Sequence, residues 1–133
     1  RNQEVLILAI DQDTNVPSNW VPFFGIPAKT PLGLAKLAKK SGAPVLSYAF
    51  LREPEGKFKL IFEKIDLTPD STSGEEELFR MNRIFNHHLE QMISREPKQW
   101  AWIHRRWRNQ PDKKSLQEME KWEDKIQLSK QNI

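Results

Sequence analysis

Two stretches near the middle of the chain set the expected fold: Pro44 to Arg52, which contains Val45-Leu46-Ser47-Tyr48-Ala49-Phe50-Leu51, and Lys57 to Ile65. Both are rich in branched apolar and aromatic residues, as is typical of β-strands. The residues between them, Glu53-Pro54-Glu55-Gly56, favour a turn. The sequence therefore predicts an antiparallel hairpin.

Helical patterns lie on both sides of this hairpin. Before it, Thr30-Pro31 is typical of a helix start, with a hydroxyl cap and a proline in the first position. Gly42 is expected to end that helix in a left-handed conformation. After the hairpin, Ser73 and Glu76 predict a capping box, and Glu96-Pro97 the helix end. The apolar face expected for this second helix consists of Leu78, Met81, Ile84, Phe85, His88, Leu89 and Met92.

Another apolar run, Val5 to Ile10, indicates a strand buried on both faces, as in the centre of a parallel sheet. Such a strand needs neighbours on both sides, so we expect a fragment whose first half is missing. The order strand, helix, strand, strand, helix predicts an α/β fold with a mixed sheet flanked by helices. We expect this domain to cover residues 1–111, followed by a charged tail over residues 112–133. The tail has a thin amphipathic stripe of Leu116, Met119, Trp122 and Ile126.

The composition of the 133-residue chain limits the classes of function. Hydrophobic residues make up 38% and charged residues 29%, which is typical of a globular domain and not of a disordered chain. The absence of cysteine excludes a thiol nucleophile and a cysteine-based zinc site. A net charge of +3 is too small to specify a partner.

The first candidate site is Asp11-Gln12-Asp13, directly after the apolar run. Ligands of open α/β sheets bind at the carboxyl ends of strands, which favours a functional role for acidic residues there. Asp11 and Asp13 together could hold a divalent metal, as in a metal-dependent phosphatase. The alternative is that Asp11 caps a turn and Asp13 is solvated.

The second candidate is the loop Trp20 to Gly25, where Trp20, Phe23 and Phe24 are costly to expose. These aromatic residues predict either a loop folded onto the core, or a wall for an acyl chain, or a wedge in the interfacial zone of a membrane.

The third candidate is Trp100 to Arg108. Between Arg95 and Lys114, seven Lys or Arg residues stand against Glu96 and Asp112, a net charge of +5. Arginines with aromatic spacers suit phosphate groups, either of nucleic acid or of an anionic lipid. A basic nucleic-acid-binding module is therefore one alternative, and a solvated basic edge with inward-facing tryptophans is another.

Several blocks of the sequence resemble the later half of the bacterial lipid A biosynthesis acyltransferases. They are Asp11-Gln12, Val21 to Thr30, Leu37-Ala38, Gly42-Ala43-Pro44-Val45, Arg52 and the closing Pro97-x-x-Trp100-x-Trp102-x-His104-Arg105-Arg106-Trp107. The resemblance covers roughly residues 4 to 111, in the right order. It implies part of a glycerolipid-acyltransferase-like fold.

The resemblance also implies a reaction: transfer of a fatty acyl group from an acyl carrier protein to a hydroxyl of a lipid A precursor. The expected place is the cytoplasmic face of the inner membrane of a Gram-negative bacterium, with neither cofactor nor metal and with no nucleic acid partner. The family's His-x4-Asp/Glu motif and its N-terminal anchor are not found in these residues. We therefore expect the catalytic base to lie in the missing half and this fragment alone to be inactive.

The resemblance further implies roles for individual residues. Asp11 and Gln12 are expected to hold the acceptor or position the base. Lys29, Thr30 and Arg52 are expected to meet phosphate or hydroxyl groups of the acceptor. His104, Arg105 and Arg106 are expected to bind anionic groups or brace the sheet.

Overall fold

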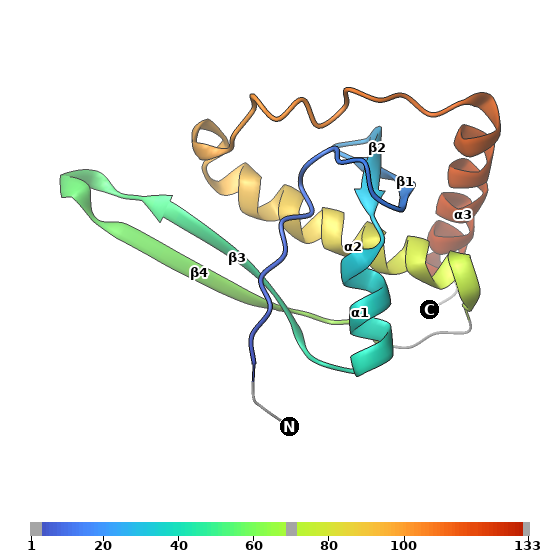
Figure 1. The fold of residues 1–133 in the computed structure, drawn as a ribbon, viewed down its shortest axis with the longest axis horizontal. Helices are drawn as coiled ribbons and strands as arrows, with labels where there is room; N and C mark the ends of the chain where they lie inside the picture. Colours follow the sequence, from blue (N-terminus) through green and yellow to red (C-terminus); the bar gives the residue numbers. More distant parts are fainter. Residues whose placement is uncertain (1–3, 69–71, 132–133) are drawn as a thin grey trace.

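The computed structural model describes residues 4–68 and 72–131 of the chain. These residues form three helices and four strands, joined by irregular segments and two short 3₁₀ turns (Figure 1). In chain order the elements are β1 (Ser18–Phe23), β2 (Ile26–Pro31), α1 (Gly33–Ser41), β3 (Val45–Arg52), β4 (Phe58–Ile65), α2 (Gly74–Arg95) and α3 (Lys113–Gln131). The 3₁₀ turns are Pro54–Gly56 and Pro97–Gln99.

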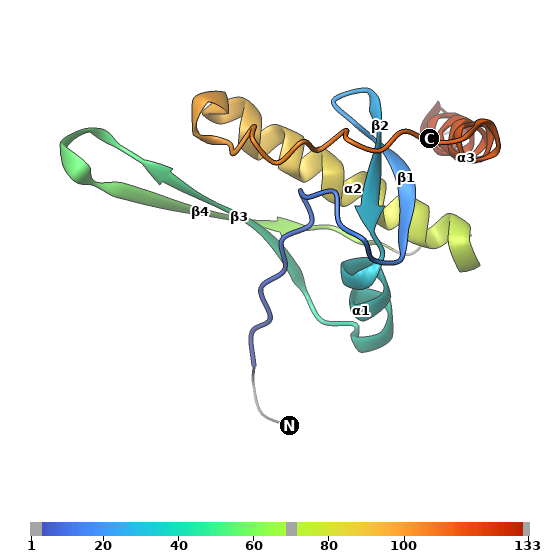
Figure 2. The same cartoon turned by 45° about the horizontal axis from the view of Figure 1, so that its top comes forward.

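The predicted hairpin is confirmed as β3 and β4, which pair antiparallel from Val45 opposite Ile65 to Arg52 opposite Phe58. It extends away from the rest of the molecule as a two-stranded arm (Figures 1 and 2). Because side chains alternate along a strand, every second residue shares one face. That face is apolar and exposed, with Leu46, Tyr48, Phe50, Phe58, Leu60 and Phe62.

Helix α2 runs through the middle of the fold and contacts β1, β3, β4, α1 and α3. Its predicted start after Ser73 and its end before Pro97 are confirmed. The capping box is wrong: Ser73 makes no side-chain cap, and the Glu76 carboxylate accepts a bond from Lys125 of α3 at 2.8 Å. The helix also buries more than the predicted face, because Phe79, Asn82, Asn86 and Ile93 are buried as well.

Strands β1 and β2 form a second antiparallel hairpin, where only a loop was predicted. Prolines 22 and 27 face each other in it. A two-stranded sheet consists of edges alone, so a proline without an N–H is tolerated there. The turn residues Phe24 and Gly25 have φ of 50° and 74°. Both values are positive, as the two-residue turns that match strand twist require.

Helix α1 begins at Gly33, later than the predicted start at Thr30-Pro31. That start is wrong because Thr30 and Pro31 are the last residues of β2 and pair with Asn19 and Ser18. The predicted end is confirmed: Gly42 has φ of 63°, and its N–H donates to the Ala38 carbonyl at 2.9 Å.

The strand predicted for Val5 to Ile10 is wrong, since these residues form no strand and Val5 to Leu8 are exposed. A doubly buried strand needs a partner on each side. In the described part of the chain β3 pairs with β4 alone, and only Ile10 of the run reaches the core. The mixed sheet is therefore not observed; the architecture is α and β elements with two separate antiparallel sheets.

The core has three clusters around α2. The first joins Ile10, α1 and the base of the arm, and the second joins β1 to α3. The third packs Phe23 and Ala28 of the β1–β2 hairpin against Ile93, with Trp100 and Trp107 around them. The predicted stripe on the tail is confirmed as the packed face of α3, where Met119 is 8% exposed. The boundary at residue 111 stays a prediction.

Candidate functional site

The segment before β1 is fastened to the segment after α2 through its two aspartates. The Asp11 carboxylate accepts a hydrogen bond from the Trp100 indole N–H at 3.1 Å. Asp13 accepts from the backbone N–H of Asn109 at 3.0 Å and from its side-chain amide at 2.7 and 2.8 Å. Gln12 lies half-buried between the two aspartates. The first and third candidate sites of the sequence therefore lie together.

Arg106 is the buried centre of this region, with 1% of its surface exposed. Its guanidinium donates from Nη1 to the Lys29 carbonyl at 2.6 Å and from Nη2 to Thr30 Oγ1 at 2.9 Å. It also lies 5.1 Å from the centre of the Phe23 ring, a cation–π distance. Burial lowers the pKa of Arg106 to about 10, while the charges of Asp11 and Asp13 act to raise it. The side chain is therefore cationic at neutral pH.

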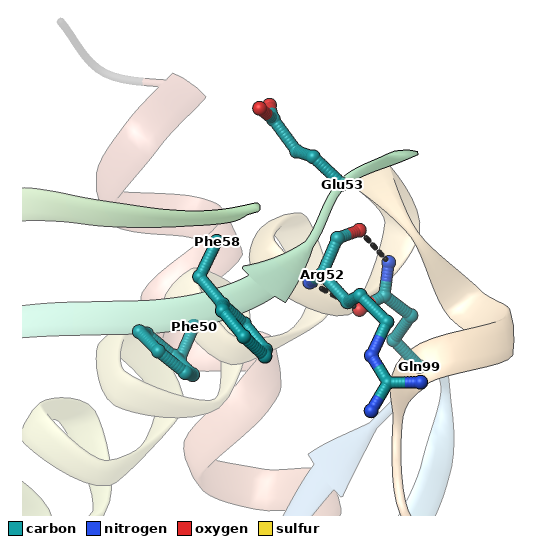
Figure 3. Close-up of a pocket in the computed structure, with 5 residues that line it drawn as sticks. All are labelled: Phe50, Arg52, Glu53, Phe58 and Gln99. Carbon is teal, nitrogen blue, oxygen red and sulfur yellow. Dashed lines mark hydrogen bonds between the residues drawn. The ribbon is translucent and has the colours of Figure 1, made fainter. Parts of the chain in front are cut away.

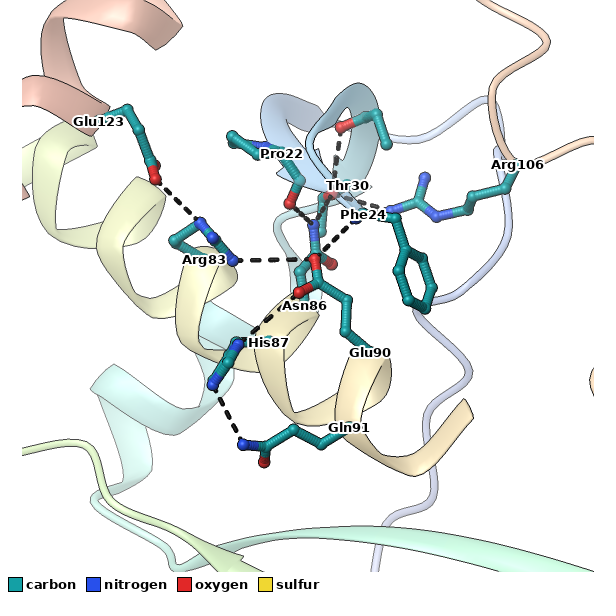
Figure 4. A network of polar contacts seen from close by, with 11 residues as sticks. Pro22, Phe24, Thr30, Arg83, Asn86, His87, Glu90, Gln91, Arg106 and Glu123 are labelled. Atoms are coloured by element: carbon teal, nitrogen blue, oxygen red, sulfur yellow. Dashed lines mark hydrogen bonds and ion pairs between the residues drawn. The ribbon is translucent and has the colours of Figure 1, made fainter. Parts of the chain in front are cut away.

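Thr30 connects Arg106 to helix α2. Its hydroxyl donates to the Ala28 carbonyl at 3.2 Å and accepts from Arg106 and from Asn86 Nδ2, the latter at 3.2 Å. Asn86 also donates to the Pro22 carbonyl at 3.1 Å, so one amide spans β1 and β2 (Figure 4). One helical turn earlier, Asn82 Nδ2 donates to Asn19 Oδ1 at 2.8 Å and to the Pro31 carbonyl at 3.2 Å.

Glu90, one turn beyond Asn86, holds the turn between β1 and β2. Its carboxylate accepts the backbone N–H of Phe24 at 2.8 Å, next to the positive φ of that residue. Arg83 lies 3.8 Å from Glu90 and 3.2 Å from Glu123 of α3. A line of charges therefore runs from α3 across α2 to the turn (Figure 4).

Sequence reasoning missed Asn82, Asn86 and Glu90, although their spacing carried a signal. They recur every four residues, so they share a face of α2, and two of them lie among apolar neighbours. Buried amides are expected to be hydrogen-bonded, and here they fix the hairpin to the helix.

The predicted site residues fall into two groups. Asp11, Phe23, Lys29, Thr30 and Arg106 lie together around the buried guanidinium, and Gln12 follows Asp11 in the chain and is half-buried. Trp20 packs with Val21, Phe79 and α3, in a different cluster from Phe23. Phe23 is fully buried, whereas Phe24, His104 and Arg105 are exposed.

Arg52 lies apart from that centre, near the tip of the arm. It lines an open cleft of about 580 Å³ with Phe50, Glu53, Phe58 and Gln99. The Gln99 side chain accepts from the backbone N–H of Arg52 at 2.7 Å and donates to its carbonyl at 3.0 Å (Figure 3). The rings of Phe50 and Phe58 stack 4.8 Å apart beside the guanidinium.

Metal sites and membrane-spanning helices are both absent from the part of the chain that the structure describes. Among residues 4–68 and 72–131, no group of three or more His, Asp or Glu side chains could hold a metal ion. Over the same residues, no helix is both long and apolar enough to cross a bilayer.

Comparison with known proteins identifies the family. Residues 1–109 match the model of the bacterial lipid A biosynthesis acyltransferases. Over 112 residues the chain is 32% identical to the lipid A biosynthesis lauroyltransferase of Escherichia coli (strain K12), covering 82% of this chain and 35% of that relative. It is 30% identical over 110 residues to the palmitoleoyltransferase of the same organism, covering 81% of this chain and 35% of the relative. The chain thus spans about a third of the length of these curated relatives. It belongs to the bacterial lipid A biosynthesis acyltransferase family.

Proposed function

We propose that this chain forms part of an O-acyltransferase that moves a fatty acyl group from an acyl carrier protein thioester to a hydroxyl of a lipid A precursor. The observation that carries the proposal is the family match, which spans residues 1–109 and so includes both fastened segments. A glycerolipid-acyltransferase-like fold of the complete protein, at the cytoplasmic face of the inner membrane of a Gram-negative bacterium, belongs to the same proposal.

The proposed reaction sets two chemical requirements. The acceptor oxygen attacks the thioester carbonyl carbon, its proton passes to a base, and the C–S bond breaks to release the carrier thiol. A positioned base contributes about 10²–10⁴-fold to such a step, and hydrogen-bond donors must stabilise the developing oxyanion. The expected base motif is His-x4-Asp/Glu, and no acidic residue stands five positions after any of the three histidines, His87, His88 and His104. We therefore propose that the base lies outside these 133 residues and that this chain alone does not transfer acyl groups.

Asp11 and Gln12 are our candidates for holding the acceptor or orienting the base. The Trp100 indole binds the Asp11 carboxylate at Oδ2, which fixes its direction. The Arg106 guanidinium acts on Asp11 through charge but does not form an ion pair with it in the described structure. Asp11 is thus a positioned, half-buried carboxylate next to a buried cation.

The other predicted residues divide by accessibility. Exposed Phe24 and half-buried Trp20 could line an acyl chain, with Phe23 supporting Phe24 from the core at 5.0 Å. Lys29, Arg52, His104 and Arg105 keep exposed surface for phosphate or hydroxyl groups. Thr30 and Arg106 are buried and hydrogen-bonded to each other, so we assign them to bracing the site.

The test is an acyl transfer assay of the complete gene product that contains this chain, with acyl carrier protein thioesters and a lipid A precursor. Asp11→Asn keeps an acceptor for the Trp100 indole but removes the charge, and we expect kcat/KM to fall at least about tenfold. Asp13→Asn is the matched control, because Asp13 is also anchored by hydrogen bonds. We expect it to stay within about threefold of the wild type. Near-wild-type turnover of Asp11→Asn removes Asp11 from the site.

A further inference from the structure

Two segments that are far apart in the sequence meet on one side of the molecule. They are the turn between β1 and β2 and the segment 100–107 after α2 (Figures 1 and 2). The Phe23 ring lies 5.8 Å from Trp100 and 5.7 Å from Trp107, and the Arg106 guanidinium lies 5.1 Å from it. We call the surface formed by Phe24, Ile26, Lys98, residues 101–105 and Arg108 the docking end.

Large apolar side chains project from both segments of the docking end. Phe24 is 40% exposed, Ile26 48%, Trp102 54% and Ile103 86%. Ring contacts join them through the core, since Phe24 touches Phe23 at 5.0 Å and Trp102 touches Trp100 at 4.5 Å. Exposed apolar groups gathered in this way mark an interaction surface.

Positively charged residues accompany these side chains in the segment 97–110. From Pro97 to Gln110 the sequence has no acidic residue, and Lys98, Arg105 and Arg108 are exposed. Asp11 and Asp13, which contact the segment, are already hydrogen-bonded to Trp100 and Asn109, and Glu96 borders the segment on its helix side. The docking end thus presents an excess of cations to a partner.

The indole of Trp102 is arranged for an apolar partner. Its N–H donates to the Pro97 carbonyl at 2.7 Å, so the ring can leave water without breaking a hydrogen bond. The buried guanidinium of Arg106 fixes the segment 100–107 to β2, which lowers the conformational entropy that this segment loses when it binds a partner.

We propose that the docking end binds the surface of an anionic lipid bilayer. Trp102, Ile103 and Phe24 enter the interfacial zone, where amphipathic rings are favoured, and Lys98, Arg105 and Arg108 contact headgroup phosphates. This inference rests on the proposed function, because an enzyme with a lipid acceptor must reach the bilayer. It goes further by naming the surface that does so.

The experiment is co-sedimentation of the 133-residue chain with vesicles of phosphatidylcholine, alone or mixed with anionic phosphatidylglycerol. We expect binding to the mixed vesicles that weakens as salt is raised. Arg105→Gln with Arg108→Gln should lower the affinity about 30-fold, because each cation near an anionic surface contributes roughly fivefold. Ile103→Asp, at the most exposed position, should lower it at least about tenfold without touching the core.

The matched control is Leu60→Ser with Phe62→Ser on the apolar face of the arm, where the two side chains are 49% and 59% exposed. It should leave vesicle binding unchanged. Loss of binding in this control, or wild-type binding of Ile103→Asp, would overturn the proposal. So would tighter binding of the wild type to a single-stranded oligonucleotide than to the vesicles. Acyl transfer by the complete protein to a detergent-dispersed acceptor separates the proposed acyltransferase function from the proposed membrane surface. Activity in this assay without vesicle binding would refute the docking end and leave the proposed function standing.

Discussion

Replacing Arg106 by methionine tests how strongly the buried guanidinium holds the site together. Methionine keeps an unbranched apolar stem but removes both donors. Each of the two bonds, at 2.6 and 2.9 Å, is a hydrogen bond from a charged group, with a contribution of about 1.5–3 kcal/mol. The contact with Phe23 adds about 1 kcal/mol.

Burial of the Arg106 charge lowers the stability of the folded state and so offsets part of these contributions. Burial lowers the pKa of Arg106 from its usual range to about 10, and a shift of this size costs the folded state about 3 kcal/mol. Because the unfolded chain holds this proton more tightly, the penalty applies in full at neutral pH and begins to decline only as the pH rises above about 10. The expected net loss on substitution is therefore about 1–4 kcal/mol.

The assay is urea or thermal unfolding of the chain, followed by circular dichroism and tryptophan fluorescence. A loss of this size should lower Tm by about 3–20 °C. Arg105→Met is the control, because Arg105 is the exposed neighbour, and it should stay within about 0.5 kcal/mol of the wild type. If both variants unfold together with the wild type, the reasoning that Arg106 braces β2 is refuted.

Three further predictions follow from the packing and the buried polar groups. Met119→Ala should cost about 2–5 kcal/mol in urea unfolding, because Met119 is 8% exposed between α3 and β1; an unchanged midpoint would show that α3 does not stabilise the fold. Asn86→Ala should cost about 1–3 kcal/mol by the same measurement, since it leaves the Pro22 carbonyl and the Thr30 hydroxyl with one donor fewer; a loss below about 0.5 kcal/mol would contradict this. Burial lowers the pKa of His88 from 6.5, against the opposing charge of Glu63. As the pH falls below about 6.5, the unfolded state therefore binds more protons than the folded state, and the free energy of unfolding decreases. His88→Gln should flatten this part of the plot of Tm against pH. An equally steep plot for the variant would assign the loss of stability to another group.

The elements predicted correctly are those whose signals are local. The β3–β4 hairpin follows from two branched and aromatic runs around Pro54 and Gly56, and the end of α1 follows from Gly42. The β1–β2 hairpin was missed because prolines 17, 22 and 27 argue against strands, and because its turn places Phe24, a residue with a side chain, at positive φ. The backbone N–H of Phe24 is bound by Glu90, 66 residues later, and no local sequence pattern predicts this hydrogen bond.

The site shows the same division. The acidic pair, the aromatic turn and the basic segment were all found in the sequence, since each is a short cluster of unusual composition. Their assembly was not, because it depends on contacts such as that between Thr30 and Arg106, which are 76 residues apart. The inward direction of Arg106 and the outward direction of Arg105 follow from that long-range bond and not from composition.

The separation between Thr30 and Arg106 also bears on how the protein is made. The 76 residues from Pro31 to Arg106 take a ribosome roughly 4 to 15 seconds to add at 5–20 residues per second. Throughout that interval the nascent chain carries Phe23 without the guanidinium and the two indoles that later cover it. Slow codons between these positions would lengthen the time in which a chaperone or a protease can engage the uncovered ring. Synonymous changes there can thus alter the yield of folded protein while its amino-acid sequence stays the same.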